Sequence, residues 1–148
     1  MKIRIDGDAC PNKEEIYSLA CQYHREMVVY CDYAHQLNDV NYTLVQCDVG
    51  KDSVDMAILD DVEAGDLVIT QDYGLASLLL MKNVRVLHVS GQEITKENIE
   101  LLLMSRYLGA KQRKMNKHIK GPHARTKDVQ DYFMRQVENI CKESLRKS

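Results

Sequence analysis

Two aspartates, Asp6 and Asp8, stand at the end of an apolar run near the start of the chain. They belong to the stretch Ile3-Arg4-Ile5-Asp6-Gly7-Asp8-Ala9-Cys10-Pro11, in which a proline suited to a first helical turn follows a strand-like run. Ligands of open parallel sheets bind beyond the carboxyl ends of the strands, where these carboxylates would lie. Gly7 between them permits close backbone approach or an unusual dihedral angle. Helix capping accounts for Asp8 alone, but less well for both acids.

A similar arrangement recurs at Leu67-Val68-Ile69-Thr70-Gln71-Asp72, where an acid again follows an apolar run and precedes a helical pattern. Taken alone, Asp72 fits the role of a helix cap. Because parallel strands end at one edge of a sheet, we expect it to lie near Asp6. A third acidic pair, Asp52 and Asp55, has the spacing that places both on one face of a helix. Acids there are also favoured by the helix dipole, with Asp52 more cap-like and Asp55 more ligand-like.

Carboxylates gathered at one edge would repel one another unless a proton or a cation lay between them. The acids expected there are Asp6, Asp8, Asp55 and Asp72, with Asp52 as a further metal-ligand candidate and Asp32 as a weaker one. Mg²⁺ and Mn²⁺ prefer such oxygen ligands. These ions activate water and bind the attacking and leaving oxygens of a phosphodiester. The pattern therefore predicts a divalent-cation site suited to phosphodiester cleavage.

Short apolar runs alternate with longer helical stretches along the chain. Strands are expected at 2–6, 27–31, 42–47, 66–70 and 84–89, and helices at 11–25, 52–62, 73–81, 95–108 and 126–145. This alternation is typical of a three-layer α/β/α domain with a mainly parallel sheet. At 148 residues we expect a single domain over 1–148, which includes the basic segment 106–127 and the C-terminal helix.

Charge is distributed unevenly along the chain. Residues 1–105 contain 8 Lys/Arg and 18 Asp/Glu, whereas residues 106–148 contain 12 and 4. No acid occurs in 106–127, a segment that could bind phosphates without sequence preference. The candidate nucleic-acid contacts in this segment are Arg113, Lys114, Lys117 and Lys120. A solvated loop explains the same composition equally well. Tyr107 is its one aromatic residue, so no base-stacking surface is indicated.

Composition argues against several other kinds of site and classes of protein. The five cysteines form no C-x-x-C pair, so reduced, buried thiols are a simpler reading than zinc or disulfides. Cys10 has no neighbouring histidine that would activate it as a nucleophile. No apolar run approaches the roughly 20 residues that span a bilayer. The N-terminus carries no apolar signal region, so we expect a cytoplasmic protein without membrane contact.

Three segments resemble the YaiI/YqxD proteins, small bacterial proteins whose domain is similar to PIN-type metal-dependent ribonucleases. They are Asp6-Gly7-Asp8-Ala9-Cys10-Pro11, Asp52-Ser53-Val54-Asp55-Met56-Ala57-Ile58 and Gly65-Asp66-Leu67-Val68-Ile69-Thr70-Gln71-Asp72-Tyr73-Gly74-Leu75-Ala76. The resemblance covers nearly the whole chain and implies a PIN-like fold, in which Asp6, Asp55 and Asp72 share the metal and Asp8 is added. Gly7 stands where this resemblance leads us to expect Ala.

The expected function is thus a Mg²⁺- or Mn²⁺-dependent nuclease, with RNA or another phosphate-containing polyanion as its partner. A haloacid-dehalogenase-like phosphatase stays open, because Asp6-Gly7-Asp8 and the pair Asp66 and Asp72 permit its aspartyl chemistry. That class needs a lysine between these motifs, and Lys51 is the one well-placed candidate. A non-catalytic nucleic-acid or nucleotide-binding protein is the third alternative, and a homodimer is left open.

Overall fold

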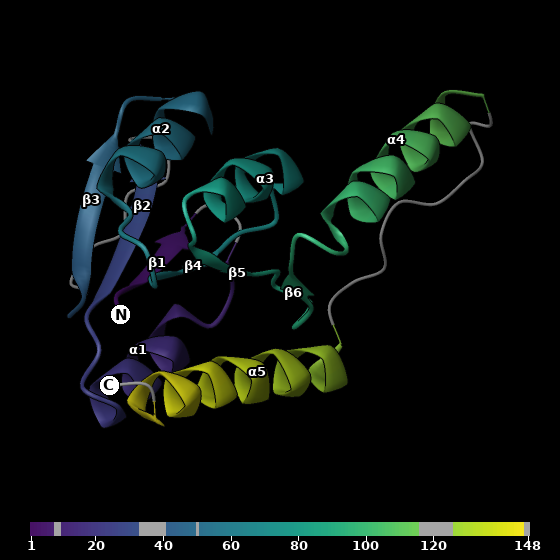
Figure 1. Cartoon of the computed structure of the whole chain (residues 1–148). Helices are drawn as coiled ribbons and strands as arrows, with labels where there is room; N and C mark the ends of the chain where they lie inside the picture. The colour runs from purple at the N-terminus through teal and green to yellow at the C-terminus, as the bar shows by residue number, and fades with distance from the viewer. Residues whose placement is uncertain (8–9, 33–40, 50, 116–125, 147–148) are drawn as a thin grey trace.

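A six-stranded sheet forms the centre of the chain (Figure 1). The computed structural model describes residues 1–7, 10–32, 41–49, 51–115 and 126–146. The strands are β1 (Ile3–Asp6), β2 (Met27–Asp32), β3 (Thr43–Cys47), β4 (Leu67–Ile69), β5 (Arg85–Leu87) and β6 (Glu93–Ile94). The helices are α1 (Lys13–Gln22), α2 (Lys51–Asp61), α3 (Tyr73–Met81), α4 (Ile99–Met115) and α5 (Lys127–Arg146).

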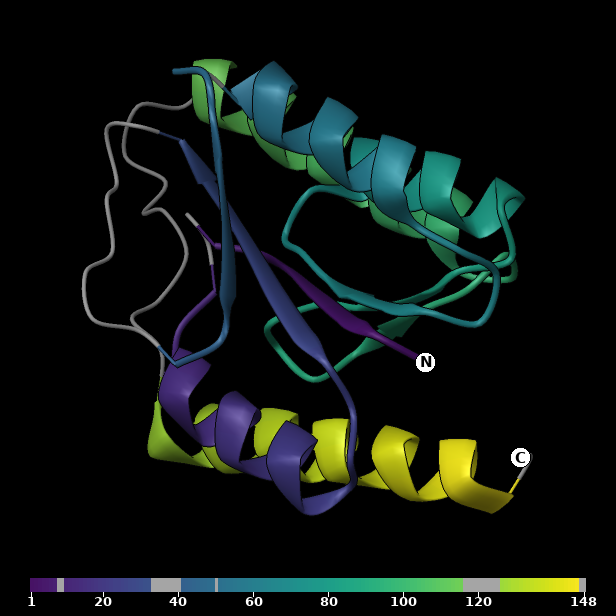
Figure 2. The same ribbon diagram turned by 90° about the vertical axis from the view of Figure 1, so that its left-hand side faces the viewer.

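The strand order across the sheet is β3-β2-β1-β4-β5-β6. The first five strands are parallel, and β6 pairs antiparallel with β5. Helices α1 and α5 cover one face of the sheet, and α2, α3 and α4 lie over the other (Figure 2). This arrangement confirms the three-layer α/β/α fold with a mainly parallel sheet. No helix in the described ranges is both long and apolar enough to cross a membrane.

The central strands are buried on both faces because each face is covered by helices. Ile3 and Ile5 of β1 lie in the core that contains Phe133 of α5. Tyr30 of β2 lies in the opposite core with Ile58 of α2. Successive residues of a strand point to opposite faces, so β1 contributes to both layers.

Several element boundaries differ from the sequence-based expectation. Helix α1 begins at Lys13 rather than at residue 11, because the N-cap residue Asn12 adopts a left-handed conformation with φ 61°. The short strand β6 was not expected. Helix α4 continues through Gly109 to Met115 instead of ending at residue 108. A glycine inside a helix costs only about 1 kcal/mol, which the helix-forming residues after it can offset.

A buried ion pair joins β1 to the start of β4. Arg4 Nε donates to Asp66 Oδ2 at 2.9 Å, and both side chains are buried. The Asp66 carboxylate also accepts from the backbone N–H groups of Lys2 and Glu63, each at 3.0 Å. Burial alone would raise the pKa of Asp66. The hydrogen bonds from Lys2, Glu63 and Arg4 outweigh burial, and the pKa lies below its usual value of 3.8.

The same arginine extends this network to β2 and α2. Arg4 Nη1 donates to the Tyr30 hydroxyl at 2.8 Å, and that hydroxyl donates to Asp61 Oδ2 at 2.9 Å. Burial and the hydrogen bond to Asp61 raise the pKa of Tyr30 to about 12, against an opposing effect of Arg4. Arg4 of β1 is thus linked directly to the start of β4 and to the middle of β2, and through Tyr30 to the end of α2.

Replacing Asp66 by Asn should lower the free energy of unfolding by about 3 kcal/mol, because Arg4 then lies buried without a charged partner. Urea denaturation followed by circular dichroism measures this change. Asp60→Asn, at an exposed acid of α2, is the matched control and should stay within about 0.5 kcal/mol of the unmodified chain. Equal losses for the two variants would contradict a structural role for the ion pair.

Stability should also fall at alkaline pH because of Tyr30. Its pKa is raised from 10.0 to about 12, so the stabilisation is complete below pH 10 and is lost as pH rises towards 12. The slope from this one group is at most about 1.4 kcal/mol per pH unit. Denaturation of the unmodified chain and of Tyr30→Phe is measured between pH 9 and 12. The difference between them isolates the contribution of Tyr30, because the other tyrosines contribute equally to the two proteins. Parallel pH profiles for the two proteins would refute this assignment.

Candidate acidic site at the carboxyl edge of the sheet

The sheet changes winding direction between β1 and β4. From β1 the chain continues to β2 and β3 on one side, whereas β4, β5 and β6 extend on the other. In open α/β sheets, ligands bind at such a point, beyond the carboxyl ends of the two strands. The ends of β1 and β4 are therefore the first place to look for a site.

Two buried aspartates end the adjacent strands β1 and β2. Asp6 and Asp32 are each 6% exposed. Asp6 pairs in register with Tyr30, which faces α2, and Asp32 follows Tyr30 by two residues. Side chains two residues apart share a face, so both carboxylates lie on the α2 side of the sheet. The sequence pattern had ranked Asp32 below the other acids.

Thr70 connects Asp6 to the start of α3. This fully buried residue follows β4, and its hydroxyl donates to Asp6 Oδ2 at 3.1 Å. The same hydroxyl accepts from the backbone N–H of Asp72 at 3.0 Å. A continuous hydrogen-bonded chain therefore crosses from β4 to β1 at the point where the winding direction changes.

The side chain of Asp72 caps α3. Its Oδ1 accepts from the backbone N–H groups of Gly74 at 2.8 Å and Leu75 at 3.2 Å. This is the capping role that the local sequence suggested for Asp72 by itself. The carboxylate is consequently held at the carboxyl edge of the sheet, with one oxygen engaged by the helix.

The acids of α2 differ from each other in burial. Asp52 is exposed, and Asp55 is half-buried beside Val54, which packs into the core under α2. Helix α2 contacts both β1 and β2, so Asp55 projects from the layer that covers Asp6 and Asp32.

Within the described ranges, no three or more Asp, Glu, His or Cys side chains gather closely enough to hold a metal ion by themselves. Asp8 lies outside these ranges, as do Lys117 and Lys120. Arg113 and Lys114 lie in the last turns of α4, a part of the helix whose side chains are not described.

Gly7 follows Asp6 in close contact with β2. Its N–H donates to the Tyr30 carbonyl at 2.7 Å. A Cβ at this position would lie 2.7 Å from Val29 Cγ1 and 2.8 Å from the Tyr30 carbonyl oxygen. Glycine therefore allows the close backbone approach that the sequence suggested, and alanine here would require β2 to shift.

The sequence profile described as "Uncharacterized BCR, YaiI/YqxD family" matches residues 4–143. The chain belongs to the YaiI/YqxD family. A UPF0178 protein of Natranaerobius thermophilus is 41% identical over 147 residues, which cover 98% of this chain and 96% of that protein. A UPF0178 protein of Enterococcus faecalis is 40% identical, covering 98% of this chain and all of its own length. No solved structure matches the chain.

Sequence reasoning overlooked several residues that follow the strands at the carboxyl edge of this YaiI/YqxD-family chain. Thr70 was not considered, although its place between a buried strand and a helix-capping acid was visible. The His88 ring stacks on Tyr73 at 5.4 Å between centroids, and Arg106 lies 6.0 Å from the Tyr73 ring. His88 Nδ1 accepts from the Ser90 N–H at 3.0 Å. This cluster begins one strand away from Asp6, and only the tertiary structure assembles it.

Asp66, one of the acids permitted by the phosphatase alternative, lies at the amino edge of β4. It is buried against Arg4, at the end of the sheet opposite Asp6 and Asp72. The phosphatase alternative therefore receives no support from this residue, whose contacts serve the fold.

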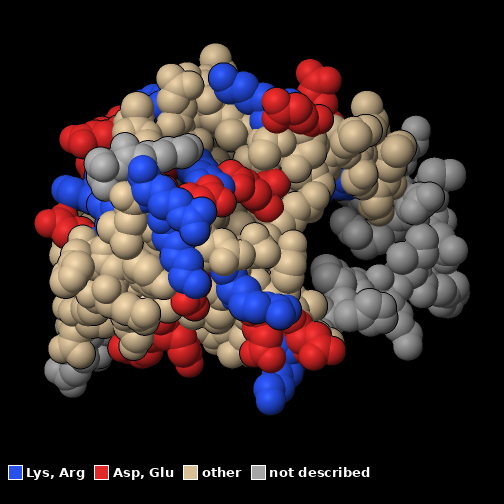
Figure 3. Space-filling model, turned by 60° about the horizontal axis from the view of Figure 1, so that its bottom comes forward, with Lys and Arg blue, Asp and Glu red and all other residues tan. Residues whose placement is uncertain are grey.

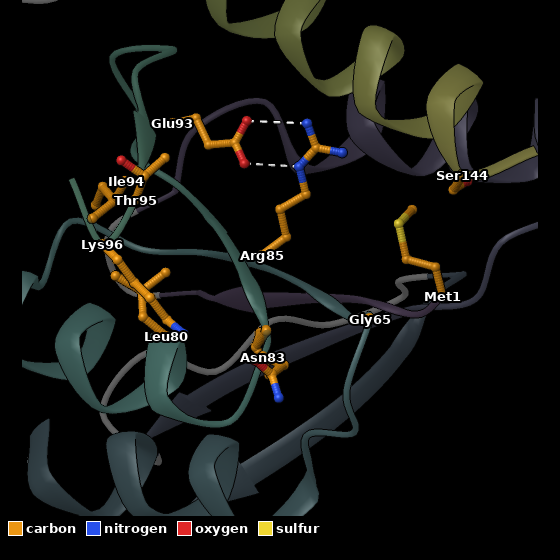
Figure 4. Close-up of a pocket in the computed structure, with 11 residues that line it drawn as sticks. Met1, Gly65, Leu80, Asn83, Arg85, Glu93, Ile94, Thr95, Lys96 and Ser144 are labelled. Atoms are coloured by element: carbon orange, nitrogen blue, oxygen red, sulfur yellow. Dashed lines mark hydrogen bonds and ion pairs between the residues drawn. The ribbon is translucent and has the colours of Figure 1, made fainter. Parts of the chain in front are cut away.

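A cavity of about 380 Å³ also lies away from the acids, at the amino ends of the strands (Figure 4). Met1, Gly65 and Asn83 line it, together with Arg85, whose guanidinium donates twice to Glu93. These residues precede or begin β1, β4 and β5, so the cavity is separated from the carboxyl edge by the length of the sheet.

The excess of positive charge occupies a shorter segment than the whole of residues 106–148. Residues 127–146, which form α5, contain 4 Lys/Arg and 4 Asp/Glu. Acidic and basic side chains are interspersed on the face that carries α1 and α5 (Figure 3). Lys142 pairs with Glu138 there, and Arg85 pairs with Glu143. The excess of basic residues thus falls in 106–125, at and beyond the end of α4.

Removal of the α3 cap should destabilise the chain because a hydrogen-bond acceptor is lost, and not because the negative charge of Asp72 is lost. Asp72→Ala should lower the free energy of unfolding by about 1 kcal/mol, because the N–H groups of Gly74 and Leu75 lose their acceptor. Asp72→Asn keeps an acceptor oxygen and should remain within about 0.5 kcal/mol of the original. Thermal unfolding compares the two variants. A loss of the same size in both would show that charge, rather than capping, sets the contribution of Asp72.

Proposed function

We propose that this chain is a Mg²⁺- or Mn²⁺-dependent nuclease that cleaves RNA at the carboxyl edge of its sheet. The observation that carries the proposal is the buried Asp6 carboxylate, which Thr70 orients at the point where the winding direction changes. Asp32 ends the adjacent strand, and Asp72 is held at the same edge by its capping contacts.

The donor set fits a hard divalent cation. Asp6 and Asp32 supply carboxylate oxygens from rigid strand ends, and α2 brings Asp55 over the same face. Mg²⁺ is commonly bound through one or two carboxylates, with waters and substrate phosphate completing its coordination. The site therefore does not need three protein ligands, and Asp8 is a further candidate beside Asp6. A bound ion of this kind supplies an activated water and neutralises charge on the phosphate.

The protein's own residues would orient and bind the substrate. Thr70 fixes the rotamer of Asp6, which places one carboxylate oxygen reproducibly at the edge. Arg106 lies next to Tyr73 at the start of α3 and is available to hold a phosphate. We further propose that basic residues of the segment 106–127 bind the phosphates of the RNA backbone without reading its sequence. These residues are Arg113, Lys114, Lys117 and Lys120.

The role of the two strand-end acids is tested by measuring RNA cleavage in the presence of Mn²⁺ or Mg²⁺. The unmodified chain is compared with the variants Asp6→Asn and Asp32→Asn. Each substitution should reduce the cleavage rate at least about 100-fold, because a charged oxygen ligand is lost while a similar shape is kept. Asp60→Asn, at an exposed acid of α2, should cleave at the original rate. Chelation of the metal should abolish cleavage by all active forms.

Equal cleavage by the unmodified chain and both strand-end variants would refute the proposal. RNA binding is measured in parallel by fluorescence anisotropy at two salt concentrations. Binding that weakens with salt, together with no turnover by any form, would favour the non-catalytic RNA-binding alternative instead.

A further inference from the structure

Three adjacent strands place a row of polar side chains at the carboxyl edge of the sheet. The last positions that pair β1 with β4 and β4 with β5 lie opposite one another, and all of them belong to the core under α1 and α5. Each following residue therefore points to the opposite face, which α2, α3 and α4 cover. These following residues are Asp6, Thr70 and His88.

His88, at the β5 end of this row, holds an aromatic ring of α3 in place. Its Nδ1 accepts from the backbone N–H of Ser90 at 3.0 Å, which fixes the orientation of the imidazole. The imidazole stacks on the ring of Tyr73, with 5.4 Å between the centroids and 29° between the planes. The Tyr73 ring is thus supported at the end of the row opposite Asp6.

Arg106 of α4 lies over this supported ring. Its guanidinium carbon is 6.0 Å from the centroid of Tyr73. Ile99, Leu102 and Arg106 follow the three- and four-residue spacing of one helix face, and the first two pack into the core that α4 shares with α3. Arg106 therefore continues the inner face of α4. The ion pairs between described residues use other side chains, so none of the described carboxylates neutralises the Arg106 charge.

The acid and the arginine lie at different ends of the row. Neighbouring strands are about 4.8 Å apart, so the backbone positions of Asp6 and His88 are on the order of 10 Å apart. A phosphodiester bound at Asp6 occupies one end of this distance. The next phosphate along a nucleotide strand comes several ångströms further on, towards the end where Arg106 lies.

We propose that Arg106 binds a second phosphate of the RNA strand, next to the phosphate that is cleaved at the acids. This inference rests on the proposed nuclease function and narrows its substrate to strands with at least two phosphates, as opposed to small esters with one. The arginine fork binds phosphate oxygens in pairs. Stacking on Tyr73 orients the fork before the substrate arrives. Arg106 is thus the binding group, and Tyr73 is a positioning residue.

Binding of a short fluorescent oligouridylate, measured by anisotropy with the metal chelated, tests Arg106 independently of cleavage. Arg106→Gln should weaken binding at least about 10-fold, because a charge-assisted contact with phosphate is lost. The slope of log K against log salt should become shallower by about 0.7, the value for one phosphate of a single strand.

Arg135→Gln is the matched control for this binding experiment. Arg135 is an exposed arginine of α5, on the face of the sheet opposite α4 (Figure 2). This variant should bind the oligouridylate as the unmodified chain does, with the same salt dependence. Equal binding by the two arginine variants, or no binding by the unmodified chain, would overturn the proposal.

The positioning role is tested at Tyr73, where the aromatic ring can be kept or removed. Tyr73→Leu should weaken binding about 3-fold, since an exposed cation–π contact contributes a factor of this size. Tyr73→Phe keeps the ring and should rescue binding. Thermal unfolding establishes that both variants are folded. Equal weakening in the two variants would show that the ring does not position Arg106.

Cleavage of two substrates separates this inference from the proposed function. With Mn²⁺, Arg106→Gln should lower kcat/KM for the oligouridylate at least about 10-fold more than for bis-nitrophenyl phosphate, which has a single phosphate, and should act mainly through KM. An equal loss for both substrates would show that Arg106 binds the cleaved phosphate itself, which would overturn the assignment. If the unmodified chain cleaves neither substrate, the nuclease proposal fails, whereas the binding experiment still decides whether Arg106 holds a phosphate.

Discussion

The buried ion pair between Arg4 and Asp66 secures the pairing of β1 with β4 at the amino edge of the sheet. Ile3 lies opposite Leu67 and Ile5 opposite Ile69 in this register. A slip of one residue would turn every side chain of a strand to the other face. The contact between Asp6 and Thr70 at the far edge exists only in the observed register. A structural charge at one end of two strands therefore determines the geometry of the acids at the other.

The two ends of these strands bury polar groups in different ways. At the amino edge the carboxylate of Asp66 is matched by the positive charge of Arg4. At the carboxyl edge the Thr70 hydroxyl orients Asp6 without adding a charge. The first arrangement suits permanent structure, because a paired buried charge is costly to disturb. The second orients the Asp6 side chain at the edge where open α/β sheets bind ligands, which is the edge that the proposed nuclease would use.

Helix α4 links two features that seem separate along the sequence. Its first half contains the exposed apolar side chains, and its second half enters the basic segment. Because the helix continues through Gly109, the exposed apolar side chains and the start of the basic segment belong to one helix.

The sequence by itself determined the alternation of strands and helices, the parallel sheet and the family, because apolar periodicity and short motifs are local properties. It also placed Asp6 and Asp72 at strand ends, and it indicated the capping role of Asp72 from local spacing. Only the tertiary structure decided which side chains meet. The Asp6–Thr70 contact, the buried Arg4–Asp66 pair and the stacking of His88 on Tyr73 join residues from different elements. Such contacts depend on strand order and register. These are set by the pairing of segments that are distant in the sequence, and no local pattern encodes them.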